Sequence, residues 1–416
     1  MTVGRAAYNA LIYAMLPQVL ARLAWRSRKQ PGYREHVAER FARYHVPRPG
    51  GPLIWIHAVS VGETRAAEPL VQALQARYPS HRILLTHMTP TGRRTGEDLF
   101  GDRVLRCYLP YDYPGAVGRF LHHFRPQLGL LMETEIWPNL IRACKARDVP
   151  LYLVNARLSE KSYRRYRRFA SLARESVSAL TAVAAQTDDD ARRLRALGAD
   201  AVTVTGSLKF DATLPAEQVE RGRAWRRGYG PRRVLLAAST REGEEPLILD
   251  ACAMMSSAPL LVIVPRHPQR FDEVAALLER RGLRYERRST GQSVSDDTRV
   301  LLGDSMGEMP AYYAACDLAF IGGSLLPFGA HNFIEACAVG TPVLLGPHTY
   351  NFAEAAERAI EAGAALPVDG AHALASAVDR LLSDEPELAR MGTRAFEFSR
   401  ANQGATERVM AMLKLK

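Results

Sequence analysis

The clearest structural signal in the sequence is the run Leu53-Ile54-Trp55-Ile56-His57-Ala58-Val59-Ser60-Val61-Gly62-Glu63. Its first part is almost entirely apolar, which is typical of a buried strand. The small residues that follow predict a tight turn, and residues 64–76 have the apolar spacing of a helix. The run therefore predicts a strand, a turn and a helix, which is the repeating unit of an α/β fold built on a parallel sheet.

The same alternation continues on both sides of a charged connector at residues 211–231. Candidate strands before the connector are 53–58, 82–86, 103–108, 128–132, 151–154, 182–185 and 202–205. Candidate strands after it are 234–238, 260–264, 300–302, 318–321 and 343–345. We predict an α/β protein of two Rossmann-like domains, 31–210 and 211–385, that face a central cleft, followed by a helical tail at 386–416. Ligands of such sheets bind at the carboxyl ends of the strands, so the loops after strands are the candidate sites.

The N-terminal residues 1–30 form a separate segment. Residues 6–21 carry no charge and end just before Arg22, and further basic residues follow. A membrane span needs about 20 apolar residues, whereas this stretch is shorter and includes Pro17. A span and a shallow interfacial helix both remain open, and so does a helix that docks on the protein without a membrane role. We expect a membrane-associating segment whose basic flank lies on the cytoplasmic side.

The composition restricts the class of protein. Lys and Arg number 55 against 44 Asp and Glu, a net charge of +11 that favours anionic partners such as phosphates, nucleic acid or acidic lipid. Nucleic acid is not expected, because no helix-turn-helix, zinc finger or RNA-binding aromatic signature accompanies the charge. The five cysteines include no Cys-x-x-Cys pair, which argues against a disulfide framework or a zinc site. Residues 161–169 interleave arginines with aromatics, and could face acidic lipid or pack their rings into the first domain.

Glu63 is the first candidate for chemistry, because it lies in the turn after the first strand. A helix N-terminus there would bind an anion and keep a nearby carboxylate ionised, so Glu63 could serve as a general base. The pair Ser60 and Glu63 also matches the Ser-x-x-Glu capping box, which has a purely structural role. The spacing alone favours the capping role.

The loops of the second domain suggest a nucleotide site. Arg266 follows a buried strand and could hold a phosphate, or be an ordinary surface arginine. The turn at 303–309 could offer backbone amides to a base, and Glu335, near the start of a helix, could accept hydrogen bonds from ribose hydroxyls. The acidic run 188–190 is interpreted as a helix start, so no acidic pair suited to a divalent cation is found. We expect a metal-free mechanism that relies on helix ends, Arg266 and Lys209.

In their order and residue identities, these motifs resemble those of the bacterial Kdo (3-deoxy-D-manno-octulosonic acid) transferase family along nearly the whole chain. One of them is Met132-Glu133-Thr134-Glu135-Ile136-Trp137-Pro138-Asn139. The others are at 26–29, 31–34, 57–63, 88–92, 109–112, 155–159, 206–211, 265–268 and 346–348. The chain departs from the family at Ala330, where a second glycine is usual, and at Phe333, where proline is common.

The resemblance implies the two-domain glycosyltransferase fold called GT-B, with CMP-Kdo as donor and the lipid A precursor lipid IVA as acceptor, in lipopolysaccharide core biosynthesis at the cytoplasmic face of the inner membrane. It implies inverting transfer without a metal or cofactor, with Glu63 as general base and Glu133 and Lys209 stabilising the transition state. The residues that it implies for holding CMP are Pro265, Arg266, Met306, Gly307, Glu308, Asn332, Phe333, Ile334 and Glu335. Two alternatives stay open: another GT-B transferase or sugar-nucleotide epimerase, and a basic membrane-surface module without turnover.

Overall fold

The computed structural model of the protein describes residues 3–45, 47–291 and 293–415. Contacts divide the chain into two compact units. The first contains the residues up to Ala212 together with those from Gln403 onward, and the second is Thr213–Asn402. The chain therefore leaves the first unit once and returns to it near its C-terminus.

The first unit is built on one parallel sheet. Over the described residues its strand order is β3-β2-β1-β4-β5-β6-β7, with every neighbouring pair parallel. The strands are β1 (Leu53–His57), β2 (Arg82–His87), β3 (Leu105–Tyr108), β4 (Leu128–Met132), β5 (Leu151–Ala156), β6 (Ala182–Ala185) and β7 (Val202–Val204). Its helices are α1 (Val3–Ala14), α2 (Leu16–Lys29), η1 (Pro31–Arg34), η2 (Val37–Phe41), α3 (Val61–Ala66), α4 (Glu68–Arg77), α5 (Pro90–Phe100), η3 (Gly101–Arg103), α6 (Pro114–Phe124), α7 (Pro138–Lys145), α8 (Glu160–Arg167), α9 (Ala170–Val177), α10 (Asp188–Leu197), η4 (Leu208–Asp211) and α19 (Ala405–Met412).

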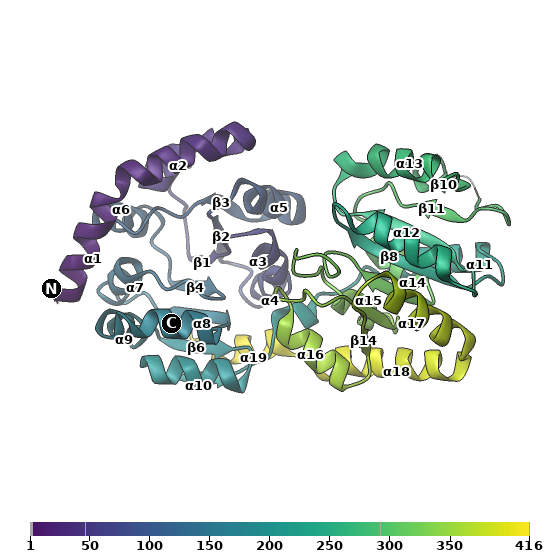
Figure 1. Cartoon of the computed structure of the whole chain (residues 1–416). Coiled ribbons are helices and arrows are strands. Elements are labelled where there is room, and N and C mark those ends of the chain that lie inside the picture. Colours follow the sequence, from purple (N-terminus) through teal and green to yellow (C-terminus); the bar gives the residue numbers. More distant parts are fainter. Residues whose placement is uncertain (1–2, 46, 292, 416) are drawn as a thin grey trace. The chain divides into compact units, whose positions relative to one another are not determined.

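Helices cover both faces of this sheet (Figure 1). Successive residues of β1 point to opposite faces, so Trp55 packs with α6, α7 and α9, whereas Ile54 and Ile56 pack with α4 and α19. All five residues of β1 are buried. This double burial explains why the strand is an apolar run rather than an alternating one.

The second unit repeats the arrangement. Within the described part of the chain its strand order is β10-β11-β9-β8-β12-β13-β14, again parallel throughout. The strands are β8 (Val234–Thr240), β9 (Leu260–Pro265), β10 (Tyr285–Arg287), β11 (Val300–Leu302), β12 (Leu318–Ile321), β13 (Val343–Leu345) and β14 (Ala365–Pro367). The helices are α11 (Ala216–Gly228), α12 (Glu244–Met254), η5 (Pro268–Arg270), α13 (Phe271–Arg280), η6 (Arg288–Thr290), α14 (Met309–Ala314), α15 (Ile334–Ala338), α16 (Ala353–Glu361), α17 (Ala371–Ser383) and α18 (Glu385–Ala401).

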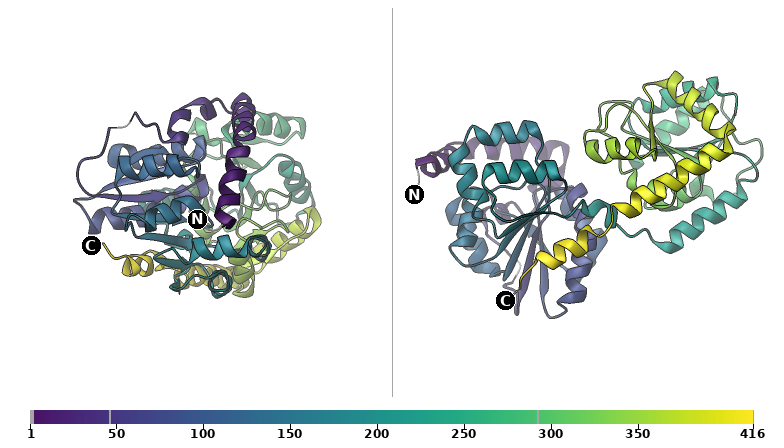
Figure 2. Two further views of the ribbon diagram at one scale, coloured as in Figure 1. Left: turned by 90° about the vertical axis from the view of Figure 1, so that its left-hand side faces the viewer. Right: turned by 90° about the horizontal axis from the view of Figure 1, so that it is seen from below.

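The N-terminal segment forms two helices that lie along the outside of the first unit (Figure 2). Arg5 of α1 forms an ion pair with Glu175 of α9 at 2.8 Å, and Tyr13 packs its ring against Tyr113. Of the described helices, none combines the length and the apolar character that crossing a bilayer requires.

We expected residues 386–416 to form a separate helical tail, but they are divided between the two units. Helix α18 belongs to the second unit and α19 to the first. The carboxylate of Asp211 accepts hydrogen bonds from the N–H groups of Gly404 and Thr406, and so fixes the start of α19. Buried residues of α19, among them Val409 and Met410, complete the core of the first unit.

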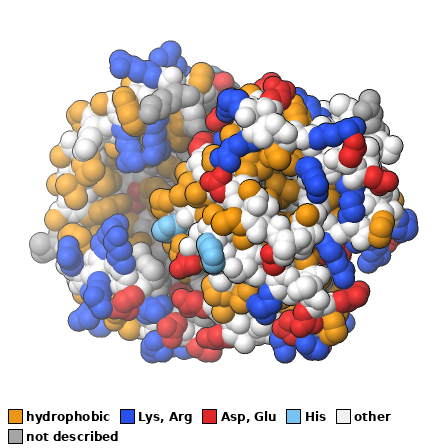
Figure 3. Space-filling model, turned by 45° about the vertical axis from the view of Figure 1, so that its right-hand side comes forward, with side chains coloured by type: hydrophobic (Ala, Val, Ile, Leu, Met, Phe, Trp, Pro, Cys, Tyr) orange, Lys and Arg blue, Asp and Glu red, His pale blue; other side chains and the backbone are white. Residues whose placement is uncertain are grey.

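Basic and acidic side chains are interspersed over the face drawn in Figure 3. The aromatic residues at 161–169 divide between the two expected roles. Tyr163 and Tyr166 pack against the core of the first unit, whereas 65% of Phe169 is exposed.

Candidate active site

Glu63 lies in the first turn of α3, directly after β1. Its carboxylate accepts a hydrogen bond from the N–H of Val59 at 2.8 Å and one from the hydroxyl of Ser60 at 3.1 Å. Ser60 is the N-cap residue, but its side chain caps no N–H group of the helix. The reciprocal hydrogen bonds of a capping box are therefore not formed, and the Ser60 hydroxyl orients the Glu63 carboxylate instead.

Two further carboxylates come from the segment after β4. Glu133 lies 3.5 Å from the ammonium of Lys209, and both side chains are largely buried. Glu135 accepts a hydrogen bond from the indole N–H of Trp137 at 2.6 Å. Glu63, Glu133 and Glu135 act on one another electrostatically, and we call these three residues the carboxylate cluster. The structure thus brings together the three predicted catalytic residues, Glu63, Glu133 and Lys209.

Burial raises the pKa of Glu63 to about 8, and the negative charge of Glu133 adds to the effect. The hydrogen bonds from Val59 and Ser60 oppose the shift but do not cancel it. The sequence predicted that the helix start would keep this carboxylate ionised. Instead, burial and the charge of Glu133 raise its pKa by more than the hydrogen bonds at the helix start lower it. A carboxylate with a raised pKa is a stronger base once ionised, which suits the removal of a proton from a hydroxyl group.

Two buried histidines, His57 and His87, end the neighbouring strands β1 and β2. His57 directs Nδ1 at the carbonyl oxygen of Thr86, 3.1 Å away, so this nitrogen carries the proton. Its Nε2 lies 3.9 Å from Glu135. Burial, reinforced by His87, lowers the pKa of His57 to about 3, and burial lowers that of His87 to about 4. Both rings are therefore neutral near pH 7 and contribute no charge to the cluster.

In the second unit, the loops at the carboxyl ends of β8 and β12 pack on one another. A Cβ atom at Gly322 would lie 2.4 Å from the carbonyl oxygen of Ser239, so only glycine permits this approach. The buried carboxylate of Glu244 accepts hydrogen bonds from the N–H groups of Gly323 at 2.6 Å and Leu325 at 3.1 Å. Glu244 thus fixes the glycine-rich loop after β12.

Arg266 follows β9 and lies in a group of basic side chains. Its N–H donates to the carbonyl oxygen of Thr240 at 3.0 Å, which ties the loops after β8 and β9 together. Burial lowers the pKa of His331 to about 3, and the positive charges of Arg266 and Arg241 add to this effect. Such a concentration of positive charge at the ends of β8 and β9 suits a phosphate or carboxylate ligand.

The remaining residues expected at the nucleotide lie on two loops. Met306 is exposed, Gly307 has φ +78°, and Glu308 pairs with Arg221 at 3.2 Å and with Arg288 at 3.3 Å. The side chains of Phe333 and Ile334 are buried, so these two residues can offer only their backbone to a ligand. The amide of Asn332 donates to Glu335 at 2.8 Å, beside the short helix α15.

Ala330 has a φ of +64°, a left-handed conformation that suits glycine. We expect Ala330→Gly to stabilise the second unit by about 0.5–1 kcal/mol, because the roughly 1–2 kcal/mol strain of alanine exceeds the extra entropy that glycine loses on folding. Thermal unfolding should show a rise of about 2–4 °C. Ala373→Gly in helix α17 is the matched control and should lower the melting temperature instead. A melting temperature unchanged or lowered in Ala330→Gly would contradict the assignment of strain.

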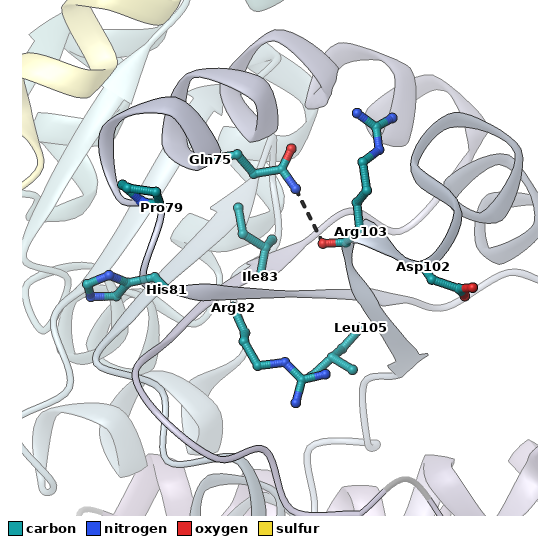
Figure 4. Close-up of a pocket in the computed structure, with 8 residues that line it drawn as sticks. All are labelled: Gln75, Pro79, His81, Arg82, Ile83, Asp102, Arg103 and Leu105. Atoms are coloured by element: carbon teal, nitrogen blue, oxygen red, sulfur yellow. Dashed lines mark hydrogen bonds between the residues drawn. The ribbon is translucent and has the colours of Figure 1, made fainter.

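A separate depression of about 340 Å³ lies at the other edge of the first sheet, where β2 and β3 begin (Figure 4). The residues around it are Gln75, Pro79, His81, Arg82, Ile83, Asp102, Arg103 and Leu105. None of them belongs to the carboxylate cluster, which lies at the carboxyl ends of the strands. Among the described residues, no group of three or more His, Cys, Asp or Glu side chains is arranged to hold a metal ion.

Sequence reasoning did not single out Glu135, Arg241 and Glu244 as site residues. Glu135 belongs to a quoted motif, but only its contact with Trp137 and its closeness to Glu133 give it a place in the cluster. Arg241 and Glu244 follow a strand, which is a general signal for a site but assigns no role. Their contacts with loops distant in sequence could not be predicted.

Comparison with known proteins agrees with this arrangement. A family model described as 3-Deoxy-D-manno-octulosonic-acid transferase (kdotransferase) matches residues 35–212, and one described as Glycosyl transferases group 1 matches 281–398. The chain is 46% identical to 3-deoxy-D-manno-octulosonic acid transferase of Bordetella pertussis, with 99% of each chain covered. It is 39% identical to the Haemophilus influenzae protein of the same name, over 98% of this chain and 97% of that one.

Solved structures show the same fold. A glycosyltransferase from Rickettsia africae superposes with a TM-score of 0.59 at 14% identity, covering 88% of this chain and 98% of that one. UDP-GlcNAc 2-epimerase from Neisseria meningitidis gives 0.59 at 16% identity, covering 87% and 99%. Two Rossmann-like domains of the GT-B type are therefore confirmed.

Proposed function

Because the chain belongs to the 3-deoxy-D-manno-octulosonic-acid transferase family, we propose that it moves Kdo from CMP-Kdo to a hydroxyl of lipid IVA with inversion and without a metal ion. The family assignment makes the chain an enzyme of the glycosyltransferase class. Donor, acceptor and mechanism are the parts that we propose. The reaction would belong to lipopolysaccharide core biosynthesis.

The observation that carries the mechanism is the buried carboxylate of Glu63 beside Glu133 and Lys209. Glu63 takes the proton of the acceptor hydroxyl while its oxygen attacks the anomeric carbon of Kdo. The bond from that carbon to the phosphate oxygen breaks, and CMP leaves with the electron pair. Glu133 and Lys209 stabilise the charge that develops around the reacting hydroxyl.

The donor is assigned to the loops of the second unit. Arg266 faces the phosphate, supported by the positive charges of Arg241 and its neighbours. Pro265, the backbone of Met306 to Glu308, and the residues Asn332, Phe333, Ile334 and Glu335 hold the rest of CMP. Since Phe333 and Ile334 are buried, they contribute backbone groups rather than side chains.

Incubation with CMP-Kdo and lipid IVA in detergent micelles, followed by mass spectrometry of the lipid, tests the proposal directly. We expect the acceptor to gain the mass of one or more Kdo residues. The same gain should occur in EDTA, since the proposed mechanism uses charged side chains rather than a cation. An unmodified acceptor with CMP-Kdo would contradict the proposed reaction, and loss of turnover in EDTA would contradict metal independence.

The pH dependence of transfer should follow the ionisation of Glu63. Its pKa of about 8 means that only a minority of molecules carry the ionised base at pH 7. We expect kcat/KM to rise about tenfold per pH unit below pH 8 and to level off above it. Initial rates from pH 5 to 9.5 measure this. An activity independent of pH across 6–9 would remove Glu63 as the group that limits the rate.

A membrane surface is the proposed location, at the cytoplasmic face of the inner membrane. The N-terminal segment exposes the large apolar residues Leu11, Tyr13, Met15, Leu20 and Trp25, and Phe169 is exposed between α8 and α9. Basic residues of α2 and α8 flank them and would attract anionic headgroups. We infer that these helices lie in the interface rather than cross it.

Replacing Leu11, Leu20 and Trp25 together with serine should weaken binding to anionic phospholipid vesicles by at least about tenfold, because each buried side chain of this size contributes on the order of 1 kcal/mol or more. Co-sedimentation with vesicles measures the change. Met254 and Phe396, which are exposed on the second unit, provide the control when replaced with serine in the same way. Equal losses in both variants would contradict a membrane face on α1 and α2.

A further inference from the structure

We propose that helix α1 has a second role in the transfer reaction, in which it holds the segment 133–139 in its active arrangement through Asp112 and Asn139. The inference rests on the proposed function, since this segment carries Glu133. Asp112 and Asn139 are then positioning residues, because they act on the reaction through Glu133 and do not touch substrate.

Helix α1 is joined to these residues by two side chains. The hydroxyl of Tyr8 donates to Asp112 Oδ2 at 2.9 Å. The amide Nδ2 of Asn139 donates to Asn9 Oδ1 at 2.7 Å and to the carbonyl oxygen of Asp112, also at 2.7 Å. Only 5% of Asp112 and 6% of Asn139 is exposed, so water cannot easily replace these bonds.

The same carboxylate fixes the start of α7. Asp112 accepts hydrogen bonds from the N–H of Asn139 at 2.9 Å and from the N–H of Leu140 at 2.8 Å. Such N–H groups have no partner inside the helix, so an acidic side chain from elsewhere satisfies them. Asn139 is the second residue of α7, and its position therefore determines where the segment 133–139 ends.

The other end of the segment is under strain. Glu133 has φ +57°, a conformation that a residue with a side chain keeps only when its surroundings enforce it. Its N–H donates to the carbonyl oxygen of Val154 at 3.0 Å. Trp137, the residue before α7, bonds to Glu135. A segment held at both ends can maintain the Glu133 conformation, whereas one released at α7 can relax.

Relaxation would move Glu133 relative to Lys209 and Glu63. The ion pair of 3.5 Å would lengthen, and Glu63 would lose part of the negative charge that faces it. The groups facing Glu63 are Glu133, Glu135 and the donors of Val59 and Ser60. Loss of the α1 contact should therefore lower kcat and also move the acidic limb of the pH profile to lower pH.

The experiment compares two kinds of α1 variant. Tyr8→Phe and Asn9→Ala remove the bonds to Asp112 and Asn139. Arg5→Gln breaks the partly buried ion pair with Glu175 of α9, so it loosens the same helix without touching segment 133–139. Transfer is measured with lipid IVA in detergent micelles, so that membrane binding does not enter.

We expect kcat to fall about tenfold in Asn9→Ala and severalfold in Tyr8→Phe, with KM for CMP-Kdo unchanged and the acidic limb displaced by about half a pH unit. Arg5→Gln should stay within twofold and keep its pH profile. If Asn9 acts only through its bond to Asn139, adding Asn9→Ala to Asn139→Ala should cause no further loss of rate. Equal effects of Arg5→Gln and Asn9→Ala, or an unchanged kcat in Asn9→Ala, would overturn the proposal.

A wild-type protein without transfer would contradict the proposed function but not this inference. The positioning role is then tested by NMR on the indole N–H resonance of Trp137, which the variant Trp137→Phe identifies. We expect this resonance to shift in Asn9→Ala and to stay in place in Arg5→Gln. A resonance that responds to neither variant would overturn the positioning role.

Discussion

Glu63→Gln should lower kcat by at least about 10²-fold, the lower range of what a positioned general base contributes. Glutamine keeps the size of the side chain but cannot accept the proton of the attacking hydroxyl. The CMP affinity should remain within twofold of wild type, since Glu63 belongs to the first unit and the nucleotide is assigned to loops of the second. Steady-state kinetics and calorimetric titration with CMP measure the two quantities.

The matched control is Glu68→Gln, which makes the same chemical change at the start of α4, outside the carboxylate cluster. Glu68 is half-buried but is not one of the three carboxylates, so this variant should retain activity within about twofold. Full activity in Glu63→Gln would remove the base assignment, whatever the control shows.

The same variant should also be more stable than wild type at alkaline pH. The folded-state pKa of Glu63, about 8, lies above its ordinary value of 4.5, so the folded protein binds more protons than the unfolded chain between these values. The favourable effect of the protonated group is present below pH 4.5 and is lost as pH rises through 8. At pH 9 Glu63→Gln should therefore gain on the order of 2–4 kcal/mol relative to wild type, and the difference should vanish near pH 4.

Arg266→Gln should lower kcat/KM for CMP-Kdo by about 10²–10³-fold, as expected for removing a donor that meets charge developing on a leaving group. Arg266→Lys should recover only part of this, because an ammonium cannot form two parallel bonds to a phosphate. CMP affinity should fall in both variants, which calorimetric titration can follow.

Arg281→Gln removes the same charge from the end of α13, where Arg281 pairs with Asp250 at 2.7 Å. It should leave kcat/KM within twofold of wild type. A loss in Arg281→Gln as large as that in Arg266→Gln would mean that net charge, and not a phosphate contact, governs donor use.

The strands could be predicted closely from the sequence, because buried parallel strands are short apolar runs. β4, β6, β11, β12 and β13 have the expected bounds. The two strands that the sequence did not reveal, β10 and β14, lie at the edges of the second sheet and have three residues each. Tyr285, Glu286 and Arg287 form no apolar run, so β10 depends on its neighbour β11 rather than on its own composition.

The sequence pointed to Glu63, Glu133 and Lys209, which the structure brings together, but it did not predict the electrostatics of these groups or the nearby Glu135. The spacing of Ser60 and Glu63 alone favours a capping pair, although a general base would also need a carboxylate in the first helical turn. What separates the two roles is the burial of Glu63 and the approach of Glu133, a residue 70 positions further along the chain. The roles proposed for Asp112 and Asn139 likewise depend on contacts with α1 that no local pattern contains.

The return of the chain to the first unit at residue 403 has a consequence for biosynthesis. Ala405, Val409, Met410 and Leu413 are part of the first unit's core, yet they are translated only after the whole second unit. Residues 1–212 therefore emerge with part of one sheet face uncovered, because α4 is in place and α19 is not. This core is complete only after the second unit has been translated. Expression of residues 1–212 alone would leave that apolar surface open to chaperones or to aggregation.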